Sequence, residues 1–191
     1  MERTEISWSA IEEYRPKILR YLARLVGPDE AEDLTQEVFL KISRTQAGFR
    51  GGAKLSTWIY RIATNTALDR LRKRANEQPG MTDEQLVAAD QSAWSGGRVV
   101  PVDQQAMNNE MNFCIRKVID SLPLNYRTVL TLGELENLKA REVAEVLGIS
   151  VENVKIRLHR ARVHLKNELE AGCSFYQTPD QNVACAPERK P

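Results

Sequence analysis

The sequence predicts an all-α fold of two small helical domains joined by a flexible acidic linker, the C-terminal domain containing a helix-turn-helix. Apolar residues recur at helical spacing in both halves of the 191-residue chain. Between the halves, residues 76–106 have neither helical nor strand periodicity and contain two prolines and three glycines, which is typical of a linker. We therefore expect a first domain over residues 1–75, a second over residues 107–171, and a tail over residues 172–191.

The first domain begins with a helix. Its apolar residues recur at helical spacing, at Ile11, Tyr14, Ile18, Leu22 and Leu25. Because Pro16 lies within this series and proline interrupts a helix, the helix is expected to begin or kink there. The segment Gly27-Pro28-Asp29 is expected to end it.

A second helix is expected over about residues 30–43, with Leu34, Val38 and Ile42 facing inward. A loop with three glycines, AGFRGGAKLST, separates it from a third helix that begins at about Thr57. The last turns of the third helix read DRLRKR, and a basic C-terminal turn suits the helix dipole.

Charge is segregated along the chain, although the net charge is only +1. Residues 50–74 contain seven basic side chains and one acid, Asp69, whereas residues 76–106 contain five acids and one base, Arg98. Any role in nucleic-acid binding therefore has to come from local charge rather than from the total.

The second domain is expected to be a run of helices that ends in a helix-turn-helix. One helical face is marked by Met111, Ile115, Val118 and Leu122, and Pro123 begins the next helix. In the following stretch, KAREVAEVLGISVENVKIRLHRA, the small Ala144 permits close approach of two helices and Gly148 lies in the turn. Ser150 is suited to cap the second helix of the motif.

That second helix has five cations and no acid between residues 155 and 166. Its apolar residues, Val154, Leu158, Ala161 and Leu165, step by four, three and four and anchor one face. Such a helix fits the major groove of DNA, where cations on its other faces meet phosphates. Lys155, Arg157 and His159 can hydrogen-bond base edges, and Ile156 can contact a thymine methyl group. The alternative for such a charge run is a solvated basic helix without a partner.

Two long stretches resemble a known family. DLTQEVFLKI (residues 33–42), followed by FRGGAKLSTWIYRIATNTALDRLRKR (residues 49–74), resembles the second conserved region of sigma factors. SLPLNYRTVLTLGELENLKAREVAEVLGISVENVKIRLHRAR (residues 121–162) similarly resembles their fourth region. The chain looks most like the extracytoplasmic-function (ECF) group of the sigma-70-type family, which keeps only these two domains.

The resemblance implies a non-catalytic subunit that docks on core RNA polymerase, directs it to promoter DNA and helps to melt the DNA at the start of transcription. It places the polymerase-binding surface on the outward residues of the DLTQEVFLKI helix, Asp33, Gln36, Glu37 and Lys41. It implies no cofactor. It also implies an anti-sigma factor, often membrane-anchored, as a further partner.

The resemblance assigns the single-stranded minus-ten element to the glycine-rich loop and the helix that follows. Phe49 and Asn65 match family positions in a pocket for a flipped base, and Gly51 and Gly52 let the backbone approach the strand. Trp58 is expected either to stack on a base or to join the core. The expected minus-ten contacts are Phe49, Arg50, Gly51, Gly52, Lys54, Trp58, Arg61, Asn65, Arg70, Arg72 and Lys73. The minus-thirty-five element is expected to be read as duplex by Ser150, Asn153, Lys155, Ile156, Arg157, His159, Arg160 and Arg162.

Other classes of protein fit the sequence less well. No apolar run approaches the length of about 18 residues that a membrane span needs, and the first residues are too acidic for a signal peptide, so we expect a cytoplasmic protein. Asp33 and Glu37 share a helical face and could bind Mg²⁺ in an enzyme, but no nucleophile or phosphate cradle accompanies them. A stand-alone helix-turn-helix regulator would need a dimerisation or receiver domain.

The tail contains two cysteines, Cys173 and Cys185, twelve residues apart on either side of a Pro-Asp turn. An inert or structural extension is one interpretation, and a metal or thiol sensor is the other. Zinc normally takes four ligands, of which this pair supplies two. Cys114 lies among apolar residues of its helix and is expected in the core.

Overall fold

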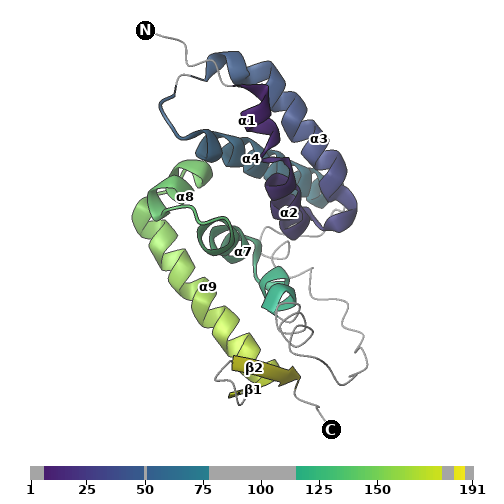
Figure 1. Ribbon diagram of the computed structural model, residues 1–191. Coiled ribbons are helices and arrows are strands. Elements are labelled where there is room, and N and C mark those ends of the chain that lie inside the picture. The colour runs from purple at the N-terminus through teal and green to yellow at the C-terminus, as the bar shows by residue number, and fades with distance from the viewer. Residues whose placement is uncertain (1–6, 50, 78–114, 178–182, 188–191) are drawn as a thin grey trace.

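The computed structural model describes residues 7–49, 51–77, 115–177 and 183–187 (Figure 1). Cys114 and all but the first two residues of the predicted linker lie outside these ranges. The N-terminal domain is formed by α1 (Trp8–Glu12), α2 (Arg15–Val26), α3 (Pro28–Thr45) and α4 (Leu55–Glu77), with a short 3-10 turn, η1 (Gln46–Gly48), after α3. The expected interruption near Pro16 is confirmed, because α1 and α2 are separate helices and Pro16 occupies the second position of α2.

Glycine and proline together set the boundary between α2 and α3. Gly27 has a φ of 92°, a backbone conformation that favours glycine, and Pro28 is the first residue of α3. Leu34, Val38 and Ile42 are buried as the helical spacing predicted. Helix α4 begins two residues earlier than expected and continues to Glu77, two residues past the predicted domain boundary.

A buried polar chain joins α2 and α4 inside this core. The hydroxyl groups of Tyr21 and Thr64 lie 2.7 Å apart, and the Thr64 hydroxyl donates to the Tyr60 carbonyl oxygen at 2.7 Å. The rings of Tyr21 and Tyr60 pack edge to face with centroids 5.4 Å apart. Burial raises the pKa of the Tyr21 phenol well above its usual value, so the hydroxyl stays protonated and available as a donor.

The C-terminal domain is also helical. Residues 115–121 are helical, and α7 (Leu124–Leu130) continues into one π-helical turn, η2 (Thr131–Leu135). Helix α8 (Ala140–Leu147) and the long α9 (Val151–Gly172) form the predicted helix-turn-helix. Gly133 in η2 permits α9 to pack closely, because a Cβ atom there would lie 3.3 Å from a methyl group of Leu158.

The two domains lie against each other (Figure 1). Helix α4 contacts α8, and α2 contacts α7. Buried residues of both domains, Ile59 and Tyr60 from α4 with Val129 and Leu132 from the C-terminal domain, belong to one continuous apolar cluster. The sequence predicted the two helical bodies correctly, but it gave no indication that they share a core.

The tail adds a feature that the sequence analysis missed. Strands β1 (Cys173–Gln177) and β2 (Val183–Pro187) pair antiparallel directly after α9. The all-α prediction is thus confirmed for both domains, and a two-stranded hairpin follows them. None of the helices in the described ranges has both the length and the apolar character needed to cross a membrane.

The Tyr21–Thr64 contact leads to a prediction for stability. Tyr21→Phe should lower the free energy of unfolding by about 1–2 kcal/mol, because it leaves the buried Thr64 hydroxyl with one partner fewer. Tyr14→Phe, which removes a hydroxyl from a half-buried tyrosine of the same domain, should change it by less than about 0.5 kcal/mol. Urea unfolding of the three chains measures both values, and equal effects would mean that the buried bond contributes nothing.

Candidate nucleic-acid interface

Helix α9 buries one face and exposes the rest. Val154 and Ala161 are fully buried, and Leu158 and Leu165 are half-buried, which confirms the predicted anchoring series. On the other faces Lys155, Ile156, His159 and Arg160 are exposed. Ile156 is 49% exposed, so its side chain is accessible to a partner. The outer surface of α9 is therefore mainly basic, with exposed apolar side chains at Ile156 and Val163.

The turn before α9 holds this surface in place. Gly148 has a φ of 65°, and the Ile149 backbone N–H donates to the Ala144 carbonyl oxygen at 3.2 Å. The Asn153 backbone N–H donates to the Ser150 hydroxyl at 3.2 Å, so Ser150 caps α9 as predicted. The cap fixes the first turn of α9, where the exposed Asn153 lies beside the predicted base-reading residues.

The cations of α9 divide into two groups. Arg162 pairs with Glu134 of η2, and Lys166 pairs with Glu170 one turn along at 3.6 Å. Lys155, Arg157 and Arg160 make no ion pair with any residue in the described ranges. These three lie toward the N-terminal half of the helix and are the ones free to meet phosphate or base edges.

A second candidate surface lies on α4 and the loop before it. Phe49 and Trp58 form a tilted ring pair with centroids 5.2 Å apart, and both are half-buried. Trp58 also packs against the core, which confirms one of its two predicted roles, and base stacking stays a prediction. Arg61 and Asn65 are exposed and follow Trp58 at three and seven positions, which places all three along one face of α4. This face thus offers an aromatic pair, a guanidinium and a free amide in a row.

The loop itself is shaped by glycine. Gly51 has a φ of 68°, and the added Cβ atom of a residue at Gly52 would meet no heavy atom within 4 Å. Both glycines are exposed, so the backbone here is accessible to a strand. Arg50 lies outside the described residues.

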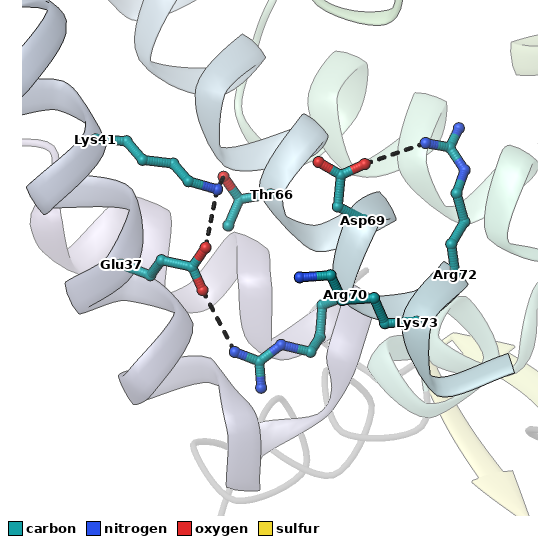
Figure 2. A pocket seen from close by; sticks show the side chains of 7 residues that line it. All are labelled: Glu37, Lys41, Thr66, Asp69, Arg70, Arg72 and Lys73. Carbon is teal, nitrogen blue, oxygen red and sulfur yellow. Dashed lines mark hydrogen bonds and ion pairs between the residues drawn. The ribbon is translucent and has the colours of Figure 1, made fainter. Parts of the chain in front are cut away.

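A paired charge network connects α3 and α4 (Figure 2). Glu37 lies between Lys41 and Arg70, at 2.8 Å and 3.4 Å, and these two cations hold the pKa of the Glu37 carboxyl below its usual value, Lys41 most strongly. Arg70 also reaches Glu30 at 3.3 Å. An open pocket of about 280 Å³ is lined by seven residues of this region, Glu37, Lys41, Thr66, Asp69, Arg70, Arg72 and Lys73.

This network ties together residues that the sequence assigned to two different tasks. Glu37 and Lys41 were predicted to bind polymerase, whereas Arg70 and Arg72 were predicted to contact the minus-ten element. Asp33 and Gln36 are exposed on α3, and Lys73 is exposed on α4. Helical spacing could not have revealed the pairing of Arg70 with acids of α3, because the partners are far apart in sequence.

Lys54, another predicted minus-ten residue, is engaged by the other domain. Its Nζ lies 2.7 Å from a carboxylate oxygen of Glu142 in α8. Glu142 also accepts the Lys139 backbone N–H at 2.7 Å and so caps α8. The Lys54 ammonium, followed by the Lys139 N–H, lowers the pKa of the Glu142 carboxyl. Glu142 had no place in the predicted site.

The two tail cysteines lie on the two strands of the hairpin, Cys173 on β1 and Cys185 on β2. Cys185 is paired with Phe175, and Cys173 is two residues from Phe175 on the same strand. Cys173 itself is paired with Pro187, so positions 173 and 185 are diagonal neighbours in the backbone register. Within the described ranges no group of three or more histidine, cysteine or acidic residues could hold a metal ion.

Comparison with known proteins covers both domains. The family model for sigma-70 region 2 matches residues 10–77, and that for sigma-70 region 4 matches residues 112–165. The ECF RNA polymerase sigma factor SigW of Bacillus subtilis is 35% identical over 166 residues, which cover 82% of this chain and 84% of the relative. The ECF RNA polymerase sigma-E factor of Haemophilus influenzae is 30% identical over 164 residues, covering 84% and 85% of the two chains.

Solved structures are similar in fold. The sigma factor RpoE of Bartonella quintana, in complex with the anti-sigma factor NepR, superposes with a TM-score of 0.65 at 21% identity, covering 85% of this chain and 95% of that one. CnrH, in complex with the cytosolic domain of CnrY, superposes with a TM-score of 0.56 at 22% identity, covering 85% and 87% of the two chains. At these identities the likeness shows the shared fold alone.

Proposed function

The chain belongs to the ECF group of sigma-70-type RNA polymerase sigma factors, and from this membership we propose how its surfaces divide the work of transcription initiation. The C-terminal domain recognises the duplex minus-thirty-five element, and the N-terminal domain recognises the minus-ten element as single strand and binds core RNA polymerase. One observation carries the proposal: both sigma regions match in order, and each carries an exposed surface suited to its own form of DNA.

The minus-thirty-five surface is the exposed part of α9. Its first turns present Asn153, Lys155 and Ile156 beyond a capped turn, which is how a recognition helix enters the major groove. Arg157 and His159 add donors for base edges, and Arg160 adds a cation for the backbone. Arg162, paired with Glu134, can reach a phosphate only by exchanging that partner.

The minus-ten surface is the face of α4 that begins at the Phe49–Trp58 pair. A base extruded from its stack needs an apolar or aromatic wall and a hydrogen-bonding edge. The aromatic pair supplies the wall, and the exposed Asn65 amide supplies a donor and an acceptor two helical turns away. Arg61, between them on the same face, is placed to hold a phosphate of the strand.

The polymerase-binding surface is the exposed face of α3, with Asp33 and Gln36 free and Glu37 and Lys41 held in the network of Figure 2. This is the part of region 2 opposite the buried Leu34, Val38 and Ile42. The chain would act as a non-catalytic specificity subunit in the cytoplasm, where polymerase and DNA are found. An anti-sigma factor is the expected regulator, by analogy with the complex of RpoE and the anti-sigma factor NepR.

A stand-alone helix-turn-helix regulator is the alternative function. Transcription in vitro with purified core polymerase and a library of promoter sequences tests both. A sigma factor makes initiation depend on the added chain at a definite set of promoters and co-purifies with the core enzyme. A stand-alone regulator would bind DNA but would not support initiation by core polymerase alone.

Asn65→Ala should abolish promoter opening without weakening the binding of core polymerase. The amide is exposed, so its loss removes an edge for the flipped base and leaves the packing of α4 intact. Permanganate footprinting of the promoter measures opening, and co-purification measures polymerase binding. Loss of polymerase binding, or normal opening, would mean that Asn65 does not read the minus-ten element.

The charge on α9 predicts a salt dependence. Each phosphate neutralised contributes about −0.9 to the slope of log affinity against log salt, so five phosphate contacts give roughly −4 to −5, and each cation that contacts a base or keeps its internal acid makes the slope shallower by about 0.9. Arg160→Ala should make the slope shallower by about one unit for every sequence. Lys155→Ala or Arg157→Ala should instead change the preference at one base pair by about 1–3 kcal/mol. Fluorescence anisotropy over a salt series measures both effects. An affinity that does not depend on salt would contradict the assignment of these cations to phosphate.

We further propose that Cys173 and Cys185 bind a thiophilic metal ion. Diagonal neighbours on an antiparallel pair have Cα atoms about 7–8 Å apart, which is long for a disulfide but suits two thiolates that each lie about 2.3 Å from a shared ion. An isolated two-stranded hairpin is marginal in water, so an ion would stabilise it.

Cys173→Ser and Cys185→Ser should each remove the response of transcription to zinc or copper and leave basal transcription unchanged. A promoter assay across zinc, copper and peroxide measures the response, and thiol titration of the purified chain reports whether the two tail thiols are protected. A response to peroxide alone would indicate a disulfide instead. If wild type and both variants respond identically and both tail thiols titrate freely, the tail is an inert extension.

A further inference from the structure

One acidic residue lies on the part of α9 that is proposed to enter the major groove. Glu152 is in the first turn of α9, its side chain is exposed, and no other acid occurs between residues 151 and 166. Glu134, which lies beside the same helix, is held by Arg162, whereas Glu152 makes no ion pair with any residue in the described ranges. The Glu152 carboxylate is therefore available to a partner outside the chain.

The direction of the Glu152 side chain follows from helical spacing. Residues four and seven positions apart share one face of a helix, so Glu152 lies in line with Ile156 and His159, which are both exposed. At about 100° per residue, this line is roughly opposite the fully buried Val154 and Ala161. Glu152 thus lies near the middle of the outer surface of α9 and not at its edge.

The unpaired cations of α9 flank this middle line. By the same spacing, Lys155 lies on one side of it, and Arg157 and Arg160 lie on the other. In a helix that enters the major groove, the flanks lie toward the two phosphate backbones and the middle faces the base edges. A carboxylate on a flank would be repelled by phosphate, whereas Glu152 is placed where the distance to both backbones is largest.

A carboxylate at this place discriminates among the four bases. An ionised carboxylate accepts hydrogen bonds and donates none. In the major groove guanine presents two acceptors, thymine presents one, and adenine presents an acceptor beside its amino group. Cytosine alone presents an amino donor without an acceptor of its own beside it. A carboxylate that faces the base edges therefore favours cytosine over the other three bases.

We propose that Glu152 is a specificity-determining residue that accepts a hydrogen bond from the N4 amino group of a cytosine in the minus-thirty-five element. The inference rests on the proposed function, to which it adds one residue and the base that this residue reads. Ser150 supports the assignment, because its hydroxyl caps the first turn of α9 and holds the backbone at Glu152 in place. The base contact therefore comes from an ordered part of the helix.

Two substitutions at Glu152 separate base reading from a structural contribution, since an acid in the first turn also suits the helix dipole. Glu152→Ala removes the acceptor. Glu152→Gln keeps the size of the side chain and supplies an amide, which suits adenine N6 and N7. The matched control is Glu168→Gln, the same change in charge at an exposed position of the same helix, about 24 Å further along.

The test measures the full chain in complex with core polymerase on promoter duplexes that differ by single base pairs in the minus-thirty-five element. The starting promoter is one selected from the library with the wild type. One position should require cytosine, and replacing that base should weaken wild-type binding roughly 5- to 150-fold, which corresponds to about 1–3 kcal/mol. At this position Glu152→Ala should bind all four bases within about twofold, and Glu152→Gln should prefer adenine. Glu168→Gln should keep the wild-type pattern.

An unchanged circular dichroism spectrum shows that the variants are folded. If both Glu152 variants keep the wild-type preference at every position, the inference is overturned. It is also overturned if they weaken binding of all duplexes alike, because that is the effect of a residue that only supports the helix. A wild type without base preference anywhere in the minus-thirty-five element would overturn the proposed function, and this inference with it.

Discussion

Helix α4 is buried on two sides while a third face stays open to solvent, and the rest of the structure is arranged around that constraint. On one side, the chain of hydroxyl groups from Tyr21 through Thr64 ties α4 to α2. On another, the Tyr60 hydroxyl reaches Glu136 of the C-terminal domain. Buried polar contacts of this kind fix one arrangement, because a missing partner leaves a desolvated group unsatisfied. They therefore determine which face of α4, with Arg61 and Asn65, is left to solvent.

Electrostatics follows the same division. The net charge is only +1, although the cations are concentrated on a few surfaces. Part of that positive charge is neutralised by ion pairs with acids of the same chain. Glu37 and Glu30 engage Arg70, Glu142 engages Lys54, and Glu134 engages Arg162. Exposed pairs of this type contribute little to stability, so a phosphate or a polymerase acidic residue can replace the internal partner at small cost. The acids thus neutralise these cations in the free chain and can be displaced from them by a partner.

The sequence predicted correctly those features that depend on residues near one another in the chain, namely helix boundaries, caps and the buried faces of helices. Pro16, Gly27 and Gly148 mark real boundaries, Ser150 caps α9, and the series from Val154 to Leu165 is the buried face of that helix. What the sequence missed is long-range or cooperative. Arg70 meets Glu37, and Lys54 meets Glu142, across separations that no periodicity encodes. The hairpin at Cys173 was missed because its two five-residue strands have no alternating pattern of their own. The individual base contacts remain predictions.

The central claim is that one chain carries two promoter readers, the exposed part of α9 for duplex DNA and the face of α4 with Arg61 and Asn65 for single-stranded DNA. The most direct measurement is the affinity of the complex with core polymerase for two DNA probes, one with a duplex minus-thirty-five element and one with a single-stranded minus-ten element. We expect Asn65→Ala to weaken binding of the minus-ten probe alone, and Lys155→Ala to weaken binding of the minus-thirty-five probe alone. A variant that weakens binding of both probes alike, or of neither, would contradict the account.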